Sequence, residues 1–563
     1  MKKWLVASDK HFNVSDDHVY EKIISELLSN RGLTGKKNIA KFLHPDLKEI
    51  NFREAGIDES ELSKAAERVK KAIKNKEQMV VYTDYDVDGI TSGAIIWETI
   101  NDLGGKIMPF VPHRVTEGYG LSETGIDRVI EKFDPRLIIT VDHGITAAEQ
   151  ISYAKKKSID VVVIDHHLAP EKLPKAVSVV HSTKMAAGGV ALLFAVYLYE
   201  KLRGQKEADK KFLSFLDLAA LATIADLVPL AGMNRVLVKY GLVSLQNTKR
   251  VGLEALIASA GLDKSKIDVY SVSHMLAPRL NSTGRILHGL DSLRLICTRD
   301  RQRAVELAEK ISMINRDRQL MTDDNTARAR ELLRVEEVKG KMGKLIFIAS
   351  DYNQGIIGLI AGKLVDLYQR PAIVVSVGAE FCKASARSVA GFNIVGLLRQ
   401  ATDLLVDVGG HPMAAGFTVR KDKLEILKKT LQGLTEKTLT DGLLVGTLAV
   451  DLILDLTLAN LKLLQAQEDL APFGMGNPQP VYASYGTVLA GYSRVGRDQK
   501  HLKFILKGGA AYLEAIAFNF GDLATQLSPG VKLDVAYTLN RDGWKGKDNL
   551  ILKIKDVRVS ANL

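Results

Sequence analysis

Three short apolar runs in the first half of the chain constrain its fold more than any other feature. Residues 79–82, 137–141 and 161–164 are rich in β-branched side chains, and helix-like stretches separate them. Such alternation is typical of βαβ units, in which parallel strands form a central sheet covered by helices. Each run ends in a polar cluster. Because ligands bind at the carboxyl ends of the strands in such sheets, the clusters predict a functional site there.

The first cluster places the carboxylates of Asp84, Asp86 and Asp88 at alternate positions, directly before Gly89. Carboxylates this close repel one another unless a cation lies among them. A calcium-binding EF-hand loop would need Glu at its twelfth position, and that position is Ile95 here. For this cluster alone, a solvated acidic turn remains the alternative to a metal site.

The later clusters add imidazoles to the carboxylates. Asp142 follows the second run, His166 and His167 lie just after the third, and Asp226 is a lone acid in an apolar stretch. Taken singly, the aspartates are compatible with helix ends and the histidines with structural roles. Together they form the mixed oxygen and nitrogen set that suits Mn²⁺ or Mg²⁺, and two such ions catalyse phosphoester hydrolysis. The sequence therefore predicts a two-metal hydrolytic site.

Charge and cysteine usage favour a nucleic-acid partner and a reducing compartment. Lys and Arg outnumber Asp and Glu by 77 to 66, and this basic surplus gives weak support for a polyanionic partner. The only cysteines, Cys297 and Cys382, are far apart and form no C-x-x-C pair, which argues against disulfides and structural zinc. We find no signal-peptide pattern and no long uncharged apolar stretch, so we expect a cytoplasmic protein without membrane association.

Composition and patterning divide the 563 residues into five expected segments, since a chain of this length accommodates several domains. Residues 301–334 are highly charged and predict one long helix or a broken pair, of the kind that bridges domains. The last segment alternates short apolar runs with turn residues, which favours a small β-barrel. The segments are a mostly helical part (1–75), an α/β domain (76–230), a helical region with the long helix (231–340), a second α/β domain (341–440) and the barrel (445–563).

These motifs resemble those of the DHH phosphoesterase superfamily, whose name is spelled by Asp165, His166 and His167. The remaining acidic motifs match the family's other metal motifs in order. The resemblance implies a set of catalytic residues, of which all but His167 are metal ligands in our prediction and His167 is a ligand or a neighbour of one. The set is Asp84, Asp86, Asp88, Asp142, His166, His167 and Asp226. Many family members have His where this chain has Tyr82, so the coordination of one ion is expected to differ.

The second α/β segment resembles the DHHA1 substrate-binding domain associated with that family. Its glycine-rich stretch at 409–416 allows backbone N–H groups to approach a phosphate, and an arginine at 387 can form two hydrogen bonds to one. The resemblance implies that substrate is bound by Ser385, Arg387, Ser388, Gly409, Gly410 and His411.

Three further stretches resemble the RecJ exonucleases within the superfamily. Residues 277–285 match an A-P-R-x-N-x-x-G-R motif, which implies substrate binding by Arg279, Asn281 and Arg285, with structural salt bridges as the alternative for the arginines. Residues 355–358 resemble a G-V-I-G turn, although Asn353 stands where His is usual. Residues 472–481 match the P-F-G-x-G-N-P-x-P-V segment that precedes the family's OB barrel.

The resemblance spans roughly residues 75–560 and implies an α/β fold with a DHH domain, a DHHA1-like domain and a C-terminal OB-type barrel. It implies a metal-dependent 5′-to-3′ exonuclease that degrades single-stranded DNA to mononucleotides in DNA repair and recombination. A helicase and a single-strand-binding protein are the implied partners, and we expect a monomer. Aromatic residues of the barrel are candidates for base stacking, with burial in its core as the alternative: Tyr482, Tyr485, Tyr492 and Phe504.

Two other functions remain as alternatives. One is a DHH phosphodiesterase for short oligonucleotides or small nucleotides, a class that usually lacks the barrel. The other is a non-catalytic Cdc45-like scaffold, in which the metal ligands have decayed. The intact ligand set argues against the scaffold.

Overall fold

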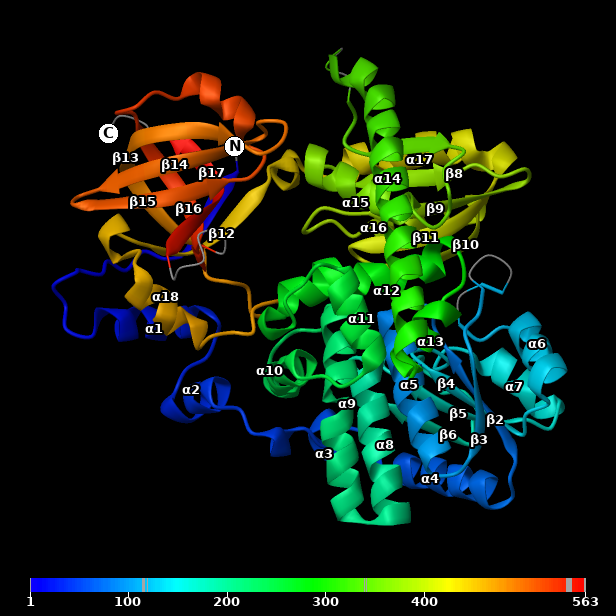
Figure 1. The fold of residues 1–563 in the computed structure, drawn as a ribbon. Helices are drawn as coiled ribbons and strands as arrows, with labels where there is room; N and C mark the ends of the chain where they lie inside the picture. The colour runs from blue at the N-terminus through cyan, green and yellow to red at the C-terminus, as the bar shows by residue number, and fades with distance from the viewer. Residues whose placement is uncertain are drawn as a thin grey trace. The chain divides into compact units, whose positions relative to one another are not determined.

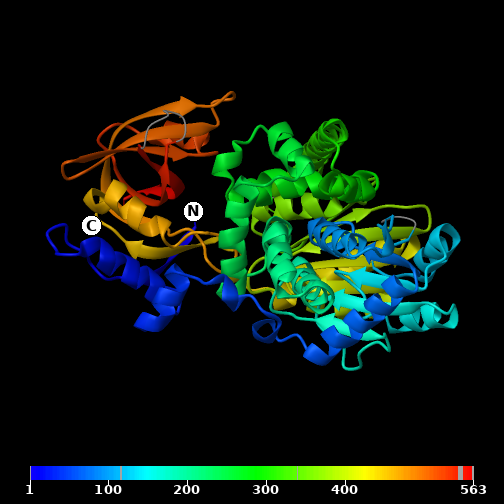
Figure 2. The same ribbon diagram turned by 60° about the horizontal axis from the view of Figure 1, so that its bottom comes forward.

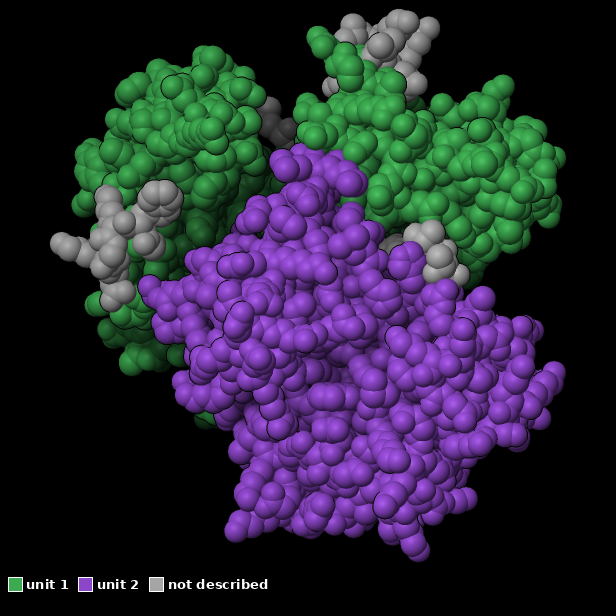
Figure 3. Space-filling model, turned by 45° about the vertical axis from the view of Figure 1, so that its right-hand side comes forward, with its two compact units in different colours: residues 1–44, 324–471, 478–563 green, residues 45–323, 472–477 purple. Residues whose placement is uncertain are grey.

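The computed structural model describes residues 2–113, 117–118, 120–338, 340, 342–542 and 549–560. The chain forms two compact units, shown in different colours in Figure 3. Unit 1 comprises residues 1–44, 324–471 and 478–563, and unit 2 comprises residues 45–323 and 472–477. Neither unit is therefore one continuous stretch of sequence.

A five-stranded parallel sheet forms the centre of unit 2 (Figure 1). The three predicted strands are confirmed as β2 (Gln78–Thr83), β4 (Leu137–Val141) and β5 (Asp160–Asp165). Two edge strands that the apolar runs did not reveal, β3 (Lys106–Phe110) and β6 (Ser178–His181), complete the order β3-β2-β4-β5-β6. The three central strands are almost wholly buried, as expected for a parallel sheet between helices.

Alternate side chains of β2 belong to two different apolar cores. Val80 and Tyr82 lie in a cluster with residues of α6 and α7, whereas Met79 and Val81 lie in a larger cluster with residues of α4, α5 and α8. This division follows from the alternation of side chains along a strand, and it places helices on both faces of the sheet. The helices of this part are α3 (Phe52–Ala55), α4 (Glu59–Lys74), α5 (Val87–Asp102), α6 (Glu123–Phe133), α7 (Ala148–Lys156), α8 (Ala187–Arg203) and α9 (Gln205–Ala225).

The region predicted to be helical has no strands among its described residues. It belongs to unit 2 up to residue 323 and to unit 1 from residue 324 on. Its helices are α10 (Gly232–Gln246), α11 (Val251–Ser259), a π-helical turn at Ser271–Leu276, α12 (Ala277–Ile286), α13 (Leu290–Cys297) and α14 (Arg301–Val338). The charged segment is thus one long helix rather than a broken pair. Across the described ranges, no helix combines the length and apolarity needed to cross a membrane.

Unit 1 contains a second five-stranded sheet, in the order β10-β11-β9-β8-β7. Its strands are β7 (Ile346–Ser350), β8 (Ala372–Ser376), β9 (Phe381–Arg387), β10 (Leu405–His411) and β11 (Ala414–Arg420). The helices α15 (Ile357–Tyr368), α16 (Ile394–Arg399) and α17 (Leu424–Thr438) belong to the same part. Apolar side chains from both the sheet and these helices form its core, which confirms the second α/β segment.

Five strands near the C-terminus close into a barrel, drawn in orange and red in Figure 1. They are β13 (Tyr482–Val495), β14 (His501–Gly508), β15 (Ala511–Ala517), β16 (Lys532–Arg541) and β17 (Leu550–Val559). Pairing runs β13-β14-β15-β17-β16, and β16 pairs back to β13, so the sheet has no free edge within this ring. This is the strand arrangement of an OB-type barrel, and the predicted fold class is confirmed.

The first 75 residues are mostly helical, as expected, but the segment begins with a strand that we did not predict. β1 (Lys3–Ser8) pairs with β12 (Thr447–Ile453), and β12 pairs with β13 of the barrel. Trp4 donates a hydrogen bond from Nε1 to Asp556 at 2.7 Å, and Arg558 lies over its ring. The strand therefore depends on partners more than 400 residues away, which local patterning does not reveal. Helices α1 (Val19–Asn30), α2 (Lys36–Leu43) and α18 (Leu461–Glu468) also belong to unit 1. Of these, α1 and α18 pack side by side, in blue and yellow-orange in Figure 2.

Candidate metal centre

The polar clusters that follow β2, β4 and β5 meet at the carboxyl edge of the unit 2 sheet, together with Asp226 at the end of α9. Ligand atoms within each of three groups lie no more than 4.8 Å apart. The structure therefore brings together all seven residues of the predicted catalytic set. The groups are Asp84, Asp86 and Asp142; Asp88, His166 and Asp226; and Asp142, His166 and His167.

Asp88 is held by backbone N–H groups of another helix. Its two carboxylate oxygens accept hydrogen bonds from Ala187 (2.8 Å) and Gly188 (2.7 Å), in the first turn of α8. A Cβ on Gly188 would lie 2.4 Å from the Cβ of Ala222 on α9 and 3.4 Å from Oδ1 of Asp88, so glycine permits the close packing here. Burial and the neighbouring carboxylate of Asp226 raise the pKa of Asp88 well above its usual range. Two hydrogen bonds thus orient Asp88, and its surroundings disfavour the ionised form of its carboxyl group.

Asp142 occupies a left-handed backbone conformation (φ 66°) directly after β4. Its backbone N–H donates to the carbonyl oxygen of Ile164 at 3.0 Å, which fixes the turn. Burial, followed by the charges of Asp88 and Asp86, raises the pKa of Asp142 well above its usual range. Burial and Asp86 likewise raise the pKa of Asp226 to about 7. A divalent cation would remove this repulsion, so the donor set fits a metal site.

His166 lies between the two carboxylate groups. Its Nε2 is 3.1 Å from Asp142 and 3.6 Å from Asp88, and its Nδ1 is 3.8 Å from Asp226. Burial and the adjacent His167 lower the pKa of His166 to about 4. The imidazole is therefore neutral near pH 7, which is the form that ligates metals.

Asp165, to which the sequence analysis gave no role beyond the motif itself, anchors both histidines. It accepts hydrogen bonds from the backbone N–H groups of His166 (2.7 Å), His167 (3.1 Å) and Ile145 (2.9 Å), and it lies 2.8 Å from Nδ1 of His167. Although burial alone would raise the pKa of Asp165, these partners hold it well below its usual range. Burial alone would lower the pKa of His167, but Asp165 raises it. Asp165 is the positioning residue of the cluster.

Tyr82, the departure from the family pattern, is buried in the apolar cluster that β2 forms with α6 and α7. Its ring packs against Phe110 (centroids 4.8 Å apart) and His143 (5.2 Å) in the apolar cluster beside α6. Burial lowers the pKa of His143 to about 4, and this neutral ring lies 3.1 Å from the carbonyl oxygen of Tyr82. Tyr82 therefore contributes to the core.

The segment at 277–285 lies beside the acidic loop as helix α12. Oδ1 of Asn281 accepts a hydrogen bond from the backbone N–H of Val87 at 2.9 Å. Arg279 donates to the carbonyl oxygen of Met275 (2.6 Å) and to Oγ of Ser312 (3.3 Å). Arg285 is in the last turn of the same helix.

The predicted phosphate-binding residues of unit 1 gather on adjacent strands. Arg387 on β9 is in register with Ala414 on β11, and Ala414 is in register with His411 on β10. Arg387 donates to Oγ of Ser385 at 3.0 Å, and a Cβ on Gly358 at the start of α15 would lie 2.9 Å from its guanidinium. The arginine thus sits against the first turn of a helix, where anions bind readily.

The three remaining residues of this group differ in their surroundings. Gly410 has a φ of 137°, and a Cβ there would lie 2.4 Å from the carbonyl oxygen of Ala414, so only glycine fits. Ser388 is buried, and its hydroxyl donates to the carbonyl oxygen of Phe392 at 2.6 Å. Gly409 is exposed on β10.

The barrel buries two of the four aromatic residues that were candidates for base stacking. Tyr482 and Phe504 are in its core, and the Tyr492 hydroxyl donates to the carbonyl oxygens of residues 524 and 527. Tyr485 is exposed. The sequence analysis did not single out Tyr512, which is 59% exposed.

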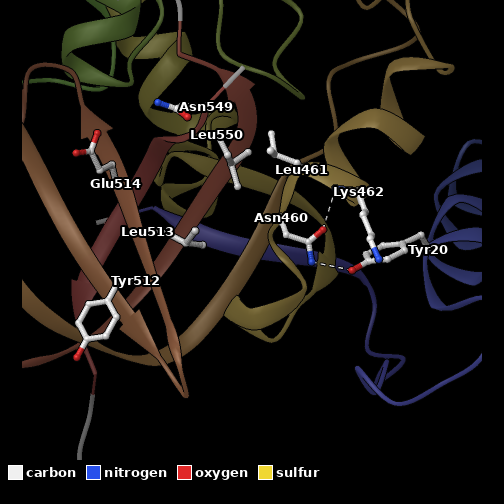
Figure 4. Close-up of a pocket in the computed structure, with 9 residues that line it drawn as sticks. All are labelled: Tyr20, Asn460, Leu461, Lys462, Tyr512, Leu513, Glu514, Asn549 and Leu550. Carbon is white, nitrogen blue, oxygen red and sulfur yellow. Dashed lines mark hydrogen bonds between the residues drawn. The ribbon is translucent and has the colours of Figure 1, made fainter. Parts of the chain in front are cut away.

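A pocket of about 720 Å³ borders the same part of the barrel (Figure 4). Figure 4 shows Tyr512 and Glu514 on β15, with Asn460 and Tyr20 on the other side of the pocket. Asn460 donates to the hydroxyl of Tyr20 at 2.7 Å. Nζ of Lys507 lies 5.4 Å from the centre of the Tyr512 ring. An exposed aromatic ring with a cation beside it is suited to stacking against a base next to a phosphate.

Three family models match successive parts of the chain. They are the DHH family, N-terminal domain (residues 78–223), the DHHA1 domain (342–437) and the RecJ OB domain (450–556). The DHH segment includes most of the acidic cluster. The DHHA1 segment includes the strands that carry Arg387 and His411, and the RecJ OB segment includes the barrel.

Similar proteins cover most of the chain. The single-stranded-DNA-specific exonuclease RecJ of Bacillus subtilis is 33% identical over 549 residues, which are 96% of this chain and 68% of that protein. The protein of the same description from Thermus thermophilus is 32% identical over 86% of this chain and 69% of its own length. The crystal structure of RecJ from Thermus thermophilus in complex with Mn²⁺ matches with a TM-score of 0.81 at 27% identity, over 100% of this chain and 80% of that one. The complex with Mg²⁺ matches with a TM-score of 0.75 at the same identity, over 100% of this chain and 79% of that one.

Proposed function

This chain belongs to the RecJ family of the DHH phosphoesterases, and from that premise we propose that it is a metal-dependent exonuclease specific for single-stranded DNA. The observation that carries the proposal is the convergence of five carboxylates and two imidazoles at one sheet edge. A cluster of this composition has the ligands that Mn²⁺ and Mg²⁺ prefer. The related crystal structures contain these two ions.

We assign the ligands according to the groups in the structure. Asp84, Asp86 and Asp142 hold one ion, while Asp88, His166 and Asp226 hold the other. Asp142 also belongs to the group that includes His166 and His167, so it is the residue best placed to serve both ions. When bound, two divalent ions supply the Lewis acidity for phosphodiester hydrolysis.

The chain's own residues keep these ligands ready for metal. Asp165 fixes both histidines through their backbone N–H groups, and burial keeps His166 neutral. The N-terminus of α8 holds both oxygens of Asp88. Because these hydrogen bonds orient the ligands, we propose that little ordering is needed when substrate enters.

We propose that the residues beyond the metal cluster hold the DNA strand. Arg387 and His411, with Ser385, Gly409 and Gly410, grip the phosphate at the 5′ end, which gives 5′-to-3′ polarity and release of mononucleotides. Ser388 stabilises the segment that follows β9 through its hydrogen bond to the carbonyl oxygen of Phe392. Arg279 and Arg285 contact phosphates of the strand, and exposed barrel aromatics such as Tyr512 stack on its bases.

The cellular setting is proposed on broader grounds. An enzyme that needs a free single strand depends on a helicase to produce it and meets single-strand-binding protein on it, so both are proposed partners in DNA repair and recombination. We propose that the protein works as a monomer in the cytoplasm. Its two cysteines are both free, which suits a reducing compartment.

The deciding experiment compares single-stranded DNA labelled at the 5′ or the 3′ end, with Mn²⁺ and with EDTA, for the wild type and Asp142→Ala. Immediate release of a labelled mononucleotide from the 5′ end, abolished by EDTA and by the substitution, is the expected result. Release from the 3′ end first would refute the polarity. Cleavage confined to very short oligonucleotides would favour a small-substrate phosphodiesterase, and strand binding without cleavage would favour a scaffold.

A further inference from the structure

Helix α12, which lies outside the matched DHH segment, touches the loop that carries three of the acidic residues. We propose that α12 is a positioning element for the metal centre, and that Asn281 sets the relation between the two metal-binding groups. This inference rests on the proposed metal-dependent function. It gives Asn281 a task other than contact with the DNA strand.

The hydrogen bond from Val87 to Asn281 supplies an acceptor that helix α5 lacks. Val87 is the first residue of α5, and the first N–H groups of a helix have no partner within it. Asp86 caps the N–H of Gly89 at 3.1 Å from within the loop. Asn281 satisfies the N–H of Val87 from a residue 194 positions away. The start of α5 is therefore fixed from two sides.

The position of this bond matters because Val87 separates the two metal-binding groups. Asp86 belongs to the group with Asp84 and Asp142, whereas Asp88 belongs to the group with His166 and Asp226. The backbone between Asp86 and Asp88 thus links the two groups. A side chain that holds the N–H in the middle of this link controls the spacing and direction of both carboxylates.

A second contact shows that α12 packs directly against the loop backbone. A Cβ on Gly284, one turn beyond Asn281, would lie 2.6 Å from the carbonyl oxygen of Tyr85 and 2.9 Å from its Cβ. Gly289, just before α13, also lies near this loop, because a Cβ there would lie 3.3 Å from the Cβ and 3.4 Å from the Cα of Tyr85. Glycine at position 284 therefore permits the approach that the hydrogen bond of Asn281 requires.

The helix is itself held in place. Ser292 on α13 donates to the carbonyl oxygen of Leu280 at 2.9 Å and lies 2.9 Å from the hydroxyl of Thr283. Leu280 is fully buried. On the other side, α13 packs against α5, where Leu293 approaches Gly93. Through α13, helix α12 is thus connected to α5, the helix whose first turn it positions.

The test is a Mn²⁺ titration of the full chain without DNA, followed by electron paramagnetic resonance of the free ion. Asn281→Ala should weaken Mn²⁺ binding roughly 10–100-fold, the usual effect of losing a group that orients metal ligands. Asn281→Asp keeps an oxygen acceptor and should restore most of the affinity. Asn247→Ala is the control, because Asn247 is an exposed residue that caps α10 through the carbonyl oxygen of Val243; it should bind Mn²⁺ like the wild type.

Gly284→Ala provides an independent variant, since it leaves Asn281 in place but separates α12 from the loop. It should weaken Mn²⁺ binding as Asn281→Ala does, and excess Mn²⁺ should recover part of the turnover in both. Should Asn281→Ala not fold, the titration of Gly284→Ala decides the question. Wild-type Mn²⁺ affinity in the folded variants, or an Asp variant no better than Ala, would overturn the inference alone. Failure of the wild type to bind Mn²⁺ or cleave DNA would instead overturn the proposed function.

Discussion

Two aspartates of the same cluster should respond to replacement by asparagine with opposite changes in stability. In the absence of metal, Asp165→Asn should destabilise the protein, whereas Asp142→Asn should stabilise it. Both variants lose a carboxylate of nearly the same size and burial. The difference comes from what surrounds each carboxylate: hydrogen-bond donors around Asp165 and other carboxylates around Asp142.

The loss of stability in Asp165→Asn follows from the N–H groups that donate to the Asp165 carboxylate. One oxygen accepts from the N–H groups of His166 and His167, and the other accepts from Ile145 at 2.9 Å. An amide keeps one acceptor, so its NH₂ group must face a backbone N–H, and an unsatisfied buried donor costs about 1–3 kcal/mol. Losing the charge-assisted bond to the His167 ring adds about 1–3 kcal/mol. We therefore expect a loss of about 2–6 kcal/mol in the free energy of unfolding.

Asp142→Asn removes a repulsive charge while keeping the volume. Burial and the neighbouring carboxylates already raise the pKa of Asp142 well above its usual range, so ionising it costs free energy when no cation is present. We therefore expect the free energy of unfolding to rise near neutral pH, because the amide carries no charge that the neighbouring carboxylates would repel. The same substitution should abolish cleavage, because it removes a proposed ligand.

Calorimetric melting in EDTA near neutral pH measures both effects. For a unit of this size, about 1 kcal/mol corresponds to a shift of about 2–4 °C. We expect Asp165→Asn to lower the melting temperature by about 4–24 °C and Asp142→Asn to raise it. Shifts of the same sign in the two variants would refute the assignment of Asp165 as a structural anchor and Asp142 as a metal ligand.

Three other predictions concern pH, phosphate and the barrel. In EDTA, the melting temperature should fall as the pH rises from about 5 to 8, because the pKa of Asp226 is raised to about 7 and the folded state binds more protons than the unfolded state across that window. Mn²⁺ at about 100 times its dissociation constant should add about 2.7 kcal/mol and flatten this profile, and a profile that is already flat in EDTA would contradict the prediction. Arg387→Lys should raise KM for strands with a 5′-phosphate roughly tenfold, because lysine cannot form two parallel hydrogen bonds to a phosphate. The exposed Arg399→Lys is the control, and equal KM values for the two variants would contradict the prediction. Tyr512→Ala should weaken binding of long single strands by about 1–3 kcal/mol, measured by fluorescence anisotropy. Cleavage of short oligonucleotides, measured by label release, should not change. An unchanged affinity for long strands would exclude the Tyr512 ring as a stacking platform.

The central part of the fold could be predicted because its signals are local. β4 is a buried apolar run bounded by polar residues, and its predicted limits agree with the structure. Edge strands lack this signal: β3 reads Lys-Ile-Met-Pro-Phe and is only partly buried. β1 is a strand because β12 pairs with it from the other end of the chain. Pattern analysis sees the residues of a strand but not the partner that stabilises it.

The candidate site could likewise be predicted where its signals are local, and its contacts between distant segments could not. The carboxylates follow apolar runs, so the common edge of the sheet brings them together. The hydrogen bond between Asn281 and Val87 joins residues 194 positions apart, and no spacing rule indicates it. In the barrel, closure of the sheet decides which ring faces outward: Tyr482 is buried and Tyr485 exposed, although both begin the same strand.

The buried acidic cluster opposes folding, and the contacts around it explain how the chain tolerates this cost. Three segments distant in sequence hold the acidic residues: α8 supplies two N–H groups to Asp88, Asp165 organises the histidines, and α12 fixes the loop through Asn281. Each of these contacts is made by the chain's own groups, so hydrogen bonds that do not involve an ion position the ligands. Flexible carboxylates would relieve their repulsion by moving apart, and binding a metal would then require them to be ordered again. The rigid arrangement keeps the repulsion in the metal-free state and converts it into affinity for divalent cations.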